Sequence, residues 1–155
     1  MPDFGESIVI DAPGDQLYAL VSDLPRMGEW SPECIRVSWT GGATGAVVGS
    51  RFIGHNQAGA IRWFTQGEVL EAEPGRRFAF QIHLGPVPIA LWEYEFTPAA
   101  TGGCTVAESW SDRRPTALRL TIGRMFGDRN KRNAKGIRTT LANLKTAAES
   151  TRQTP

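Results

Sequence analysis

The sequence predicts an α+β fold in which an antiparallel sheet wraps around one long C-terminal helix, with two short helices after the first strand. Two observations predict this fold. Strand-like segments follow one another up to Trp110, and short links rich in glycine and proline separate them. From Pro115 onward the apolar residues instead recur at helical spacing. A lone long helix needs a sheet to cover its apolar side, and the two layers can leave an apolar space between them.

The composition limits the classes of protein to consider. The chain of 155 residues fits one domain, which we place at residues 1–150, followed by a loose tail at residues 151–155. The formal net charge of +1 argues against a general nucleic-acid binder. Cys34 and Cys104 have no metal-type spacing and are too few for a disulfide framework, so we expect reduced thiols. Reduced thiols favour a cytoplasmic protein, and since no signal peptide or membrane-spanning run is evident, we expect it to be soluble.

The first third of the chain predicts a strand, two short helices and two further strands. Residues 7–11 alternate and are β-branched, which suits a strand, and Pro13 suits the first turn of a helix. A second short helical turn should end at Trp30, because Pro32 follows it closely. Strand patterns then follow at residues 34–40 and 50–56.

Four strand patterns within residues 61–110 predict an antiparallel meander, because turn-forming links separate them. In one of these strands Trp92, Tyr94 and Phe96 alternate with mainly charged residues, so its aromatic face should point inward. On the last strand the same alternation places the carboxylate of Glu108 in the interior.

The closing helical tract has one apolar face, but polar residues and glycines interrupt it. Asn130 and Asn133 fall on the apolar face, so we expect both amides to point into the core. Gly123 and Gly127 weaken the helical pattern, and a new helix could begin at Arg129. The sequence therefore leaves open whether the tract is continuous.

Four segments carry a family resemblance that covers nearly the whole chain. They are Ile10-Asp11-Ala12-Pro13, the helix at residues 16–23, Glu29-Trp30-Ser31-Pro32, and residues 140–145 in the closing helix. Their order resembles the START-like superfamily, also called SRPBCC, and within it the polyketide cyclase/dehydrase and lipid transport branch. The resemblance implies a helix-grip fold with an internal cavity. Because this superfamily includes lipid carriers, hormone receptors and cyclases, the resemblance indicates the fold and not a reaction.

Eight aromatic side chains are the main candidates for a ligand-binding wall. Aromatic faces bind flat apolar molecules, while Trp and Tyr also offer a hydrogen-bonding atom. Ordinary core packing is the alternative for each of them. The candidates are Trp30, Phe52, Trp63, Phe80, Trp92, Tyr94, Trp110 and Phe126.

The interior polar residues Glu108, Asn130 and Asn133 need hydrogen-bond partners, because a buried polar atom without one destabilises the protein by roughly 1 to 3 kcal/mol. They either bond to one another or to water, or they contact the polar group of a ligand. No second group beside Glu108 is evident for proton transfer, so we assign no catalytic residue. His55 and His83 fall on outward strand positions, and no pattern indicates a metal or another cofactor.

A basic ridge, made of Arg124, Lys131, Lys135 and Arg138, recurs at helical spacing away from the apolar face. A solvated outer surface is the simpler interpretation. The alternative is transient contact with an anionic membrane surface or an acidic partner during ligand exchange. Nucleic acid is disfavoured, since no exposed stacking aromatics accompany the ridge.

We therefore expect a protein that binds or transports a hydrophobic small molecule, such as a lipid or a polyketide-like aromatic, in an internal cavity. The competing hypothesis is a polyketide cyclase/dehydratase-type enzyme in which Glu108 or Tyr94 moves a proton inside the same cavity. A third is a protein-interaction module that uses the basic ridge. The sequence leaves the identity of the ligand and the oligomeric state open.

Overall fold

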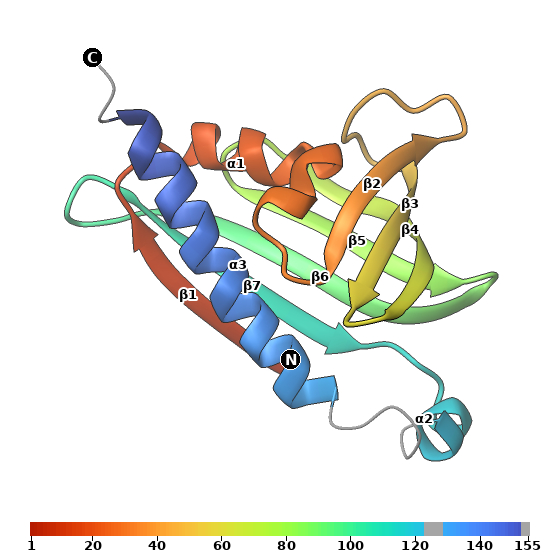
Figure 1. Ribbon diagram of the computed structural model, residues 1–155. Coiled ribbons are helices and arrows are strands. Elements are labelled where there is room, and N and C mark those ends of the chain that lie inside the picture. Colours follow the sequence, from red (N-terminus) through yellow and green to blue (C-terminus); the bar gives the residue numbers. More distant parts are fainter. Residues whose placement is uncertain (123–128, 153–155) are drawn as a thin grey trace.

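The computed structural model describes residues 1–122 and 129–152. Its strands form one antiparallel sheet in the order β1-β7-β6-β5-β4-β3-β2, and helix α3 lies across one face of it, the inner face (Figure 1). The elements are β1 (Phe4–Ile10), α1 (Gly14–Ser22), the 3-10 helix η1 (Leu24–Glu29), β2 (Cys34–Thr40), β3 (Arg51–Ala58), β4 (Ile61–Glu73), β5 (Arg77–Leu84), β6 (Val87–Pro98), β7 (Cys104–Asp112), α2 (Thr116–Ile122) and α3 (Arg129–Arg152). This architecture confirms the predicted helix-grip α+β fold.

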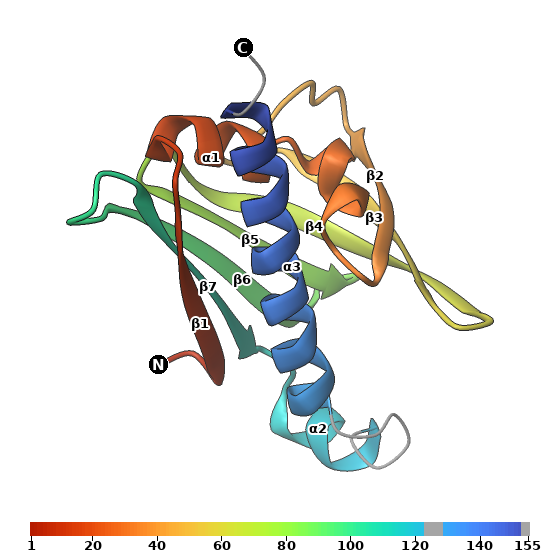
Figure 2. The same cartoon turned by 60° about the vertical axis from the view of Figure 1, so that its left-hand side comes forward.

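Helix α3 packs on the edge strand β1 and its neighbour β7. Two contacts define its direction: Arg138 forms an ion pair with Glu6 at 2.9 Å, and Lys145 Nζ donates to the carbonyl of Val9 at 3.1 Å. The helix therefore runs parallel to β1 and antiparallel to β7. Helix α1 covers β5 and β6, and η1 packs on β2, so the helices share the same face of the sheet (Figure 2).

The predicted long C-terminal helix is α3, but the helical tract contains two described helices. Helix α2 ends at Ile122 and α3 begins at Arg129, the position at which the sequence allows a new start. Gly123 and Gly127 lie outside the described residues. Helix α2 lies beyond the end of β7 and off the axis of α3 (Figures 1 and 2). Helix α3 continues to Arg152 and so includes the first two residues of the expected tail. None of the described helices is long and apolar enough to cross a membrane.

Aromatic rings pack against one another under α1. Tyr18 of α1 meets the rings of Phe78 and Phe96 edge to face, at 6.0 and 5.9 Å between ring centroids. Farther along the sheet, Phe52 lies over the backbone of Gly67, where a Cβ atom would come within 2.1 Å of the ring. Only a residue without a side chain allows that approach, so this glycine is part of the core packing.

Both cysteines are buried and free, which confirms the prediction of reduced thiols. Cys34 begins β2 and Cys104 begins β7. Burial raises the pKa of Cys34 to about 11, so this thiol stays protonated and unreactive at neutral pH.

Candidate functional site

A buried carboxyl group lies on the inner face of the sheet, as the alternation predicts. Glu108 of β7 is 2% exposed and stands directly opposite Tyr94 of β6 in the strand register. Directly opposed residues point to the same side of the sheet, which brings their side chains together. The Tyr94 hydroxyl donates a hydrogen bond to Glu108 Oε1 at 2.7 Å. The second carboxyl oxygen, Oε2, is buried and makes no hydrogen bond with the described residues.

Burial keeps this carboxyl neutral. It raises the pKa of Glu108 from the ordinary 4.5 to about 8, although the hydrogen bond from Tyr94 acts in the opposite direction. At pH 7 the carboxyl therefore carries a proton for most of the time. Since Oε1 already accepts from Tyr94, that proton belongs on Oε2, which makes it a hydrogen-bond donor. Burial also raises the pKa of Tyr94 well above its usual range, so the phenol remains a donor as well.

Two further buried donors lie on the same face of the sheet and on the helix that covers it. Trp110 follows Glu108 by two residues on β7 and points to the same face, and its indole Nε1 has no hydrogen-bond partner among the described residues. Asn133 of α3 is 8% exposed, and its Nδ2 is likewise buried and unpartnered in the described part of the chain. This burial confirms the prediction that Asn133 points into the core.

The contacts of α3 place Asn133 level with Trp110. Arg138 contacts Glu6, and Glu6 is opposite Glu108 in the register of β1 and β7. Asn133 precedes Arg138 by five residues, or about 7.5 Å along the helix. Trp110 follows Glu108 by two residues, or about 6.8 Å along the strand. Because α3 runs antiparallel to β7, the two displacements point the same way, so Asn133 and Trp110 lie at about the same level on facing elements.

The inner face beside these donors is only partly covered. The inward-facing side chains near the β5–β6 hairpin are half-buried, whereas those toward α1, such as Val69 and Phe78, are fully buried. We call the half-buried group the open inner face. It consists of Asn56, Trp63, Thr65, Ile82 and Trp92. Two tryptophans and an isoleucine give it a mainly apolar character, which suits contact with an apolar ligand.

The structure separates the predicted aromatic wall into two groups. Trp63 and Trp92 belong to the open inner face, and Tyr94 and Trp110 are buried beside it. Trp30, Phe52 and Phe80 are also buried, and Phe52 and Phe80 pack edge to face with ring centroids 5.5 Å apart. Trp30 lies at the end of η1, where its carbonyl accepts a hydrogen bond from α3. Phe126 lies outside the described residues.

The prediction that Asn130 points into the core is wrong, because this residue is exposed. It lies in the first turn of α3, about 4.5 Å before Asn133 along the helix axis. Since Asn133 is level with the start of β1, the edge strand ends before it reaches Asn130. The apolar spacing of the helix is real, but its first turn extends beyond the start of β1.

The two histidines do not join the site. His55 lies edge to face with Phe64 at 5.0 Å between ring centroids, on the outer face of the hairpin that β3 and β4 form. The ring nitrogen Nδ1 of His83 lies 3.1 Å from the carbonyl oxygen of Gly85 in the following turn. Both positions agree with the alternation that placed these residues outside.

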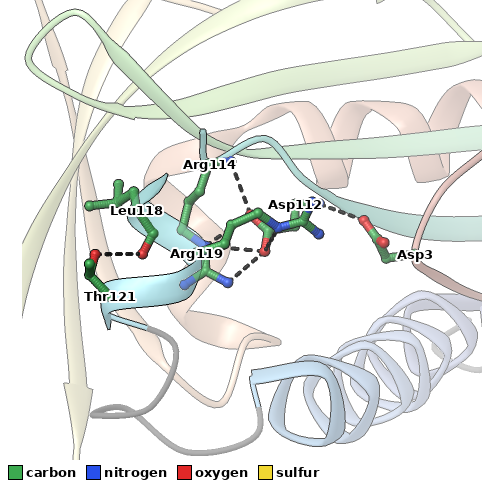
Figure 3. A network of polar contacts seen from close by, with 6 residues as sticks. All are labelled: Asp3, Asp112, Arg114, Leu118, Arg119 and Thr121. Atoms are coloured by element: carbon green, nitrogen blue, oxygen red, sulfur yellow. Dashed lines mark hydrogen bonds and ion pairs between the residues drawn. The ribbon is translucent and has the colours of Figure 1, made fainter. Parts of the chain in front are cut away.

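A charged network at the end of β7 was not predicted from the sequence. Asp112 is almost fully buried and binds one edge of the Arg114 guanidinium, with Nη2 to Oδ2 at 2.5 Å and Nε to Oδ1 at 2.9 Å (Figure 3). Arg119 of α2 also approaches Asp112, at 3.3 Å. The sequence signal is the short run of charges before Pro115, which resembles an ordinary solvated linker.

An open groove of about 800 Å³ lies on the other, outer face of the sheet. Its floor consists of small and charged side chains that alternate with the inward-facing ones, among them Ser7, Ser109, Glu93 and Glu95. Arg77 crosses it and forms ion pairs with three glutamates, which are Glu71, Glu93 and Glu95. These charges pair with one another, although Arg77 Nε is buried and makes no hydrogen bond with the described residues.

The fold has relatives among solved structures, although none of the curated proteins matches the sequence. The solution structure of the Polyketide_cyc-like protein Cgl2372 from Corynebacterium glutamicum is 35% identical, with 97% of this chain and 93% of that chain covered and a TM-score of 0.61. DR_A0006 from Deinococcus radiodurans is 21% identical, with coverages of 92% and 93% and a TM-score of 0.62. The di-domain ARO/CYC StfQ from the steffimycin biosynthetic pathway is 15% identical, with coverages of 96% and 51% and a TM-score of 0.69. The last two show likeness of fold alone.

A family model confirms the resemblance that the sequence carries. The model described as polyketide cyclase / dehydrase and lipid transport matches residues 1–149, which is nearly the whole chain. Together with the relative at 35% identity, this match shows that the chain belongs to the polyketide cyclase/dehydrase and lipid transport family.

Proposed function

We propose that this protein binds a hydrophobic small molecule, of the lipid or polyketide-like aromatic kind, between α3 and the inner face of the sheet. The observation that carries the proposal is the set of buried donors on facing elements: Glu108 Oε2, Trp110 Nε1 and Asn133 Nδ2. Each makes no hydrogen bond with the described residues, and such a group destabilises a fold by roughly 1 to 3 kcal/mol. A ligand oxygen would satisfy them. Donors without acceptors select a molecule that presents carbonyl, carboxyl or hydroxyl oxygens.

The open inner face supplies the apolar part of the proposed site. Trp63, Ile82 and Trp92 point inward but remain half-exposed. Covering them with a ligand removes apolar surface from water, which contributes roughly 25 cal/mol per Å². The proposed orientation follows from this geometry, with the apolar body of the ligand on the tryptophans and its oxygens toward β7 and α3.

A titration with a neutral fluorescent aromatic, 1-aminoanthracene, tests this function. We expect binding with a Kd in the micromolar range, because the apolar contact offsets the cost of association by a modest margin. Trp92→Ala should weaken binding at least several-fold. The matched control is Phe64→Ala, which removes an aromatic ring that is 70% exposed on the opposite face of the same sheet. Absence of binding, or equal weakening by the two variants, contradicts the proposal.

An enzymatic role is the second candidate, and one specific observation favours it. Glu108 has a pKa of about 8 and accepts a hydrogen bond from the phenol of Tyr94. A carboxyl group that stays protonated at neutral pH can donate a proton in general acid catalysis. Glu108→Gln keeps the shape of the neutral carboxyl but removes its exchangeable acid proton. For a carrier, ligand affinity and transport should survive this substitution. If turnover of an identified substrate falls by orders of magnitude while affinity is kept, the enzymatic role is correct.

A further inference from the structure

A buried guanidinium with one free edge lies at the end of β7. Asp112 binds the Nε and Nη2 edge of Arg114, whose side chain is only 10% exposed. The remaining nitrogen, Nη1, is buried and has no hydrogen-bond partner among the described residues. Because an arginine cannot lose its charge near neutral pH, this N–H group stays a charged donor in need of an acceptor.

Among the described residues, the arginines around Arg114 outnumber the carboxylates that lie near them. Arg129, in the first turn of α3, interacts electrostatically with Arg114, Arg132, Asp112 and Glu33. Burial and the two nearby arginines lower the pKa of Arg129, which means that its surroundings destabilise the charged form. Arg132 approaches Glu33 at 3.5 Å, and Arg119 approaches Asp112. In the part of the chain that the structure describes, these four arginines thus interact with two carboxylates, Asp112 and Glu33, while a third, that of Asp3, accepts a hydrogen bond from the backbone N–H of Asp112. We call Arg114, Arg119, Arg129 and Arg132 the arginine cluster.

The arginine cluster continues the line of donors at the proposed binding site. Arg129 precedes Asn133 by four residues, so it lies about one helical turn farther along the same face of α3. Arg114 follows Trp110 by four residues, just beyond the end of β7. The neutral donors Trp110 and Asn133 therefore lie between β7 and α3, and the cations Arg114 and Arg129 lie next to them, where β7 ends and α3 begins. The start of α3 adds a favourable helix dipole for a negative charge.

We propose that the arginine cluster binds the carboxylate, or a chemically similar anionic group, of an apolar ligand whose body lies on the open inner face. The inference deepens the proposed function and rests on it, because it assigns the ligand a charge and an orientation. The free edge of Arg114 and the charge of Arg129 hold the anion, and Arg132 and Arg119 add to the attraction from the rim. Charge-assisted bonds of this kind are the strong ones in a partly dehydrated site.

The test compares two ligands that differ only at the polar end, decanoic acid and 1-decanol, by displacement of 1-aminoanthracene at pH 7. We expect the wild-type protein to bind decanoate at least about tenfold more tightly than decanol, the ratio that one charge-assisted hydrogen bond provides. Arg129→Gln should reduce that preference to about twofold or less and leave the affinity for decanol unchanged. Arg132 is half-exposed, so Arg132→Gln should not disturb folding, and it should reduce the preference for decanoate in part. The control is Arg76→Gln, an exposed arginine in the turn between β4 and β5, which should leave the preference intact.

The outcomes separate this inference from the function on which it rests. If neither decanoate nor decanol displaces the probe, the proposed function fails and the inference fails with it. Equal affinity of the wild-type protein for the two ligands, or a preference that survives Arg129→Gln, overturns only the anion site. A third arm uses vesicles of phosphatidylglycerol. If Arg129→Gln abolishes co-sedimentation with them while the preference for decanoate persists, the cluster serves a membrane surface and the inference is wrong.

Discussion

The protonation of buried Glu108 makes the stability of the fold depend on pH. Its pKa lies near 4.5 in the unfolded chain and at about 8 in the folded protein. Between these values the folded state holds more protons than the unfolded state, so stability falls as pH rises. The stabilisation by the protonated form is complete below pH 4.5 and is lost as pH passes 8. Glu108 is therefore a pH-sensitive group within the core of the described residues.

The first prediction is that Glu108→Gln removes this dependence. Relative to the wild-type protein, the variant should gain stability from pH 5 to pH 8 by up to about 1.4 kcal/mol per pH unit, the linkage limit for one proton. Urea unfolding at several pH values measures the difference. Glu95→Gln, on the outer face of β6, is the control and should show no such trend. A constant difference between Glu108→Gln and wild type across this range shows that Glu108 does not titrate near 8.

At the residue scale the sequence predicted which side chains are buried better than it predicted their hydrogen-bond partners. Alternation on β7 correctly placed Glu108 inside, and the helical period correctly placed Asn133 inside. Neither pattern identifies Tyr94 as the partner of Glu108, because that contact depends on the register of two strands. The arginine cluster was missed for a similar reason, since Arg114 and Arg129 come from different segments that meet only in the folded chain.

At the scale of elements, the packing of Phe52 on Gly67 connects β3 to β4. The second prediction is that Gly67→Ala destabilises the protein by about 1 to 3 kcal/mol, because the new methyl group overlaps the ring and forces the core apart. Gly45→Ala is the matched control, since a Cβ atom there meets nothing within 4 Å and the backbone has an ordinary conformation. It should change stability by less than about 0.5 kcal/mol. Equal unfolding midpoints for the two variants in urea are inconsistent with this packing.

The sheet was predictable because each hairpin combines alternation with turn residues, and both act locally. The predicted strand at residues 34–40 coincides with β2, and the links around residues 74–75 and 101–103 lie between strands as expected. The helical period alone did not predict where α2 ends and α3 begins. Glycines weaken a helix, but they do not determine whether it stops or changes direction. The exposure of Asn130 depends on where β1 begins relative to α3, and that is a property of the tertiary structure.

For the whole molecule, the basic ridge bears on how a ligand would be exchanged. Lys131, Lys135 and Arg138 are exposed on α3, while Arg124 lies outside the described residues. Arg138 also pairs with Glu6 and lies 5.5 Å over the ring of Phe4, so part of the ridge stabilises the contact of α3 with β1. Its remaining charge lies near the arginine cluster, at the same end of α3.

The third prediction is that the protein associates with anionic vesicles at low ionic strength, since each Lys or Arg near such a surface contributes about 1 kcal/mol. Changing Lys131 and Lys135 to Glu should abolish co-sedimentation and alter folding stability by only a few tenths of a kcal/mol. A variant with Arg51 and Arg76 changed to Glu carries the same charge change at the other end of the sheet and is the control. If the wild-type protein does not sediment with the vesicles, the ridge is a solvated surface.

The indole N–H signals of the five tryptophans test the central claim most directly. In a ¹H–¹⁵N spectrum, titration with 1-decanol should move the Nε1–H signal of Trp110 downfield as it gains the hydroxyl oxygen as an acceptor, and the signal of Trp92 should shift with it. Trp39, on β2 at the opposite edge of the sheet, should stay in place. If Trp110 does not respond at saturating 1-decanol, or if only the remote Trp39 responds, then no ligand binds between α3 and the inner face.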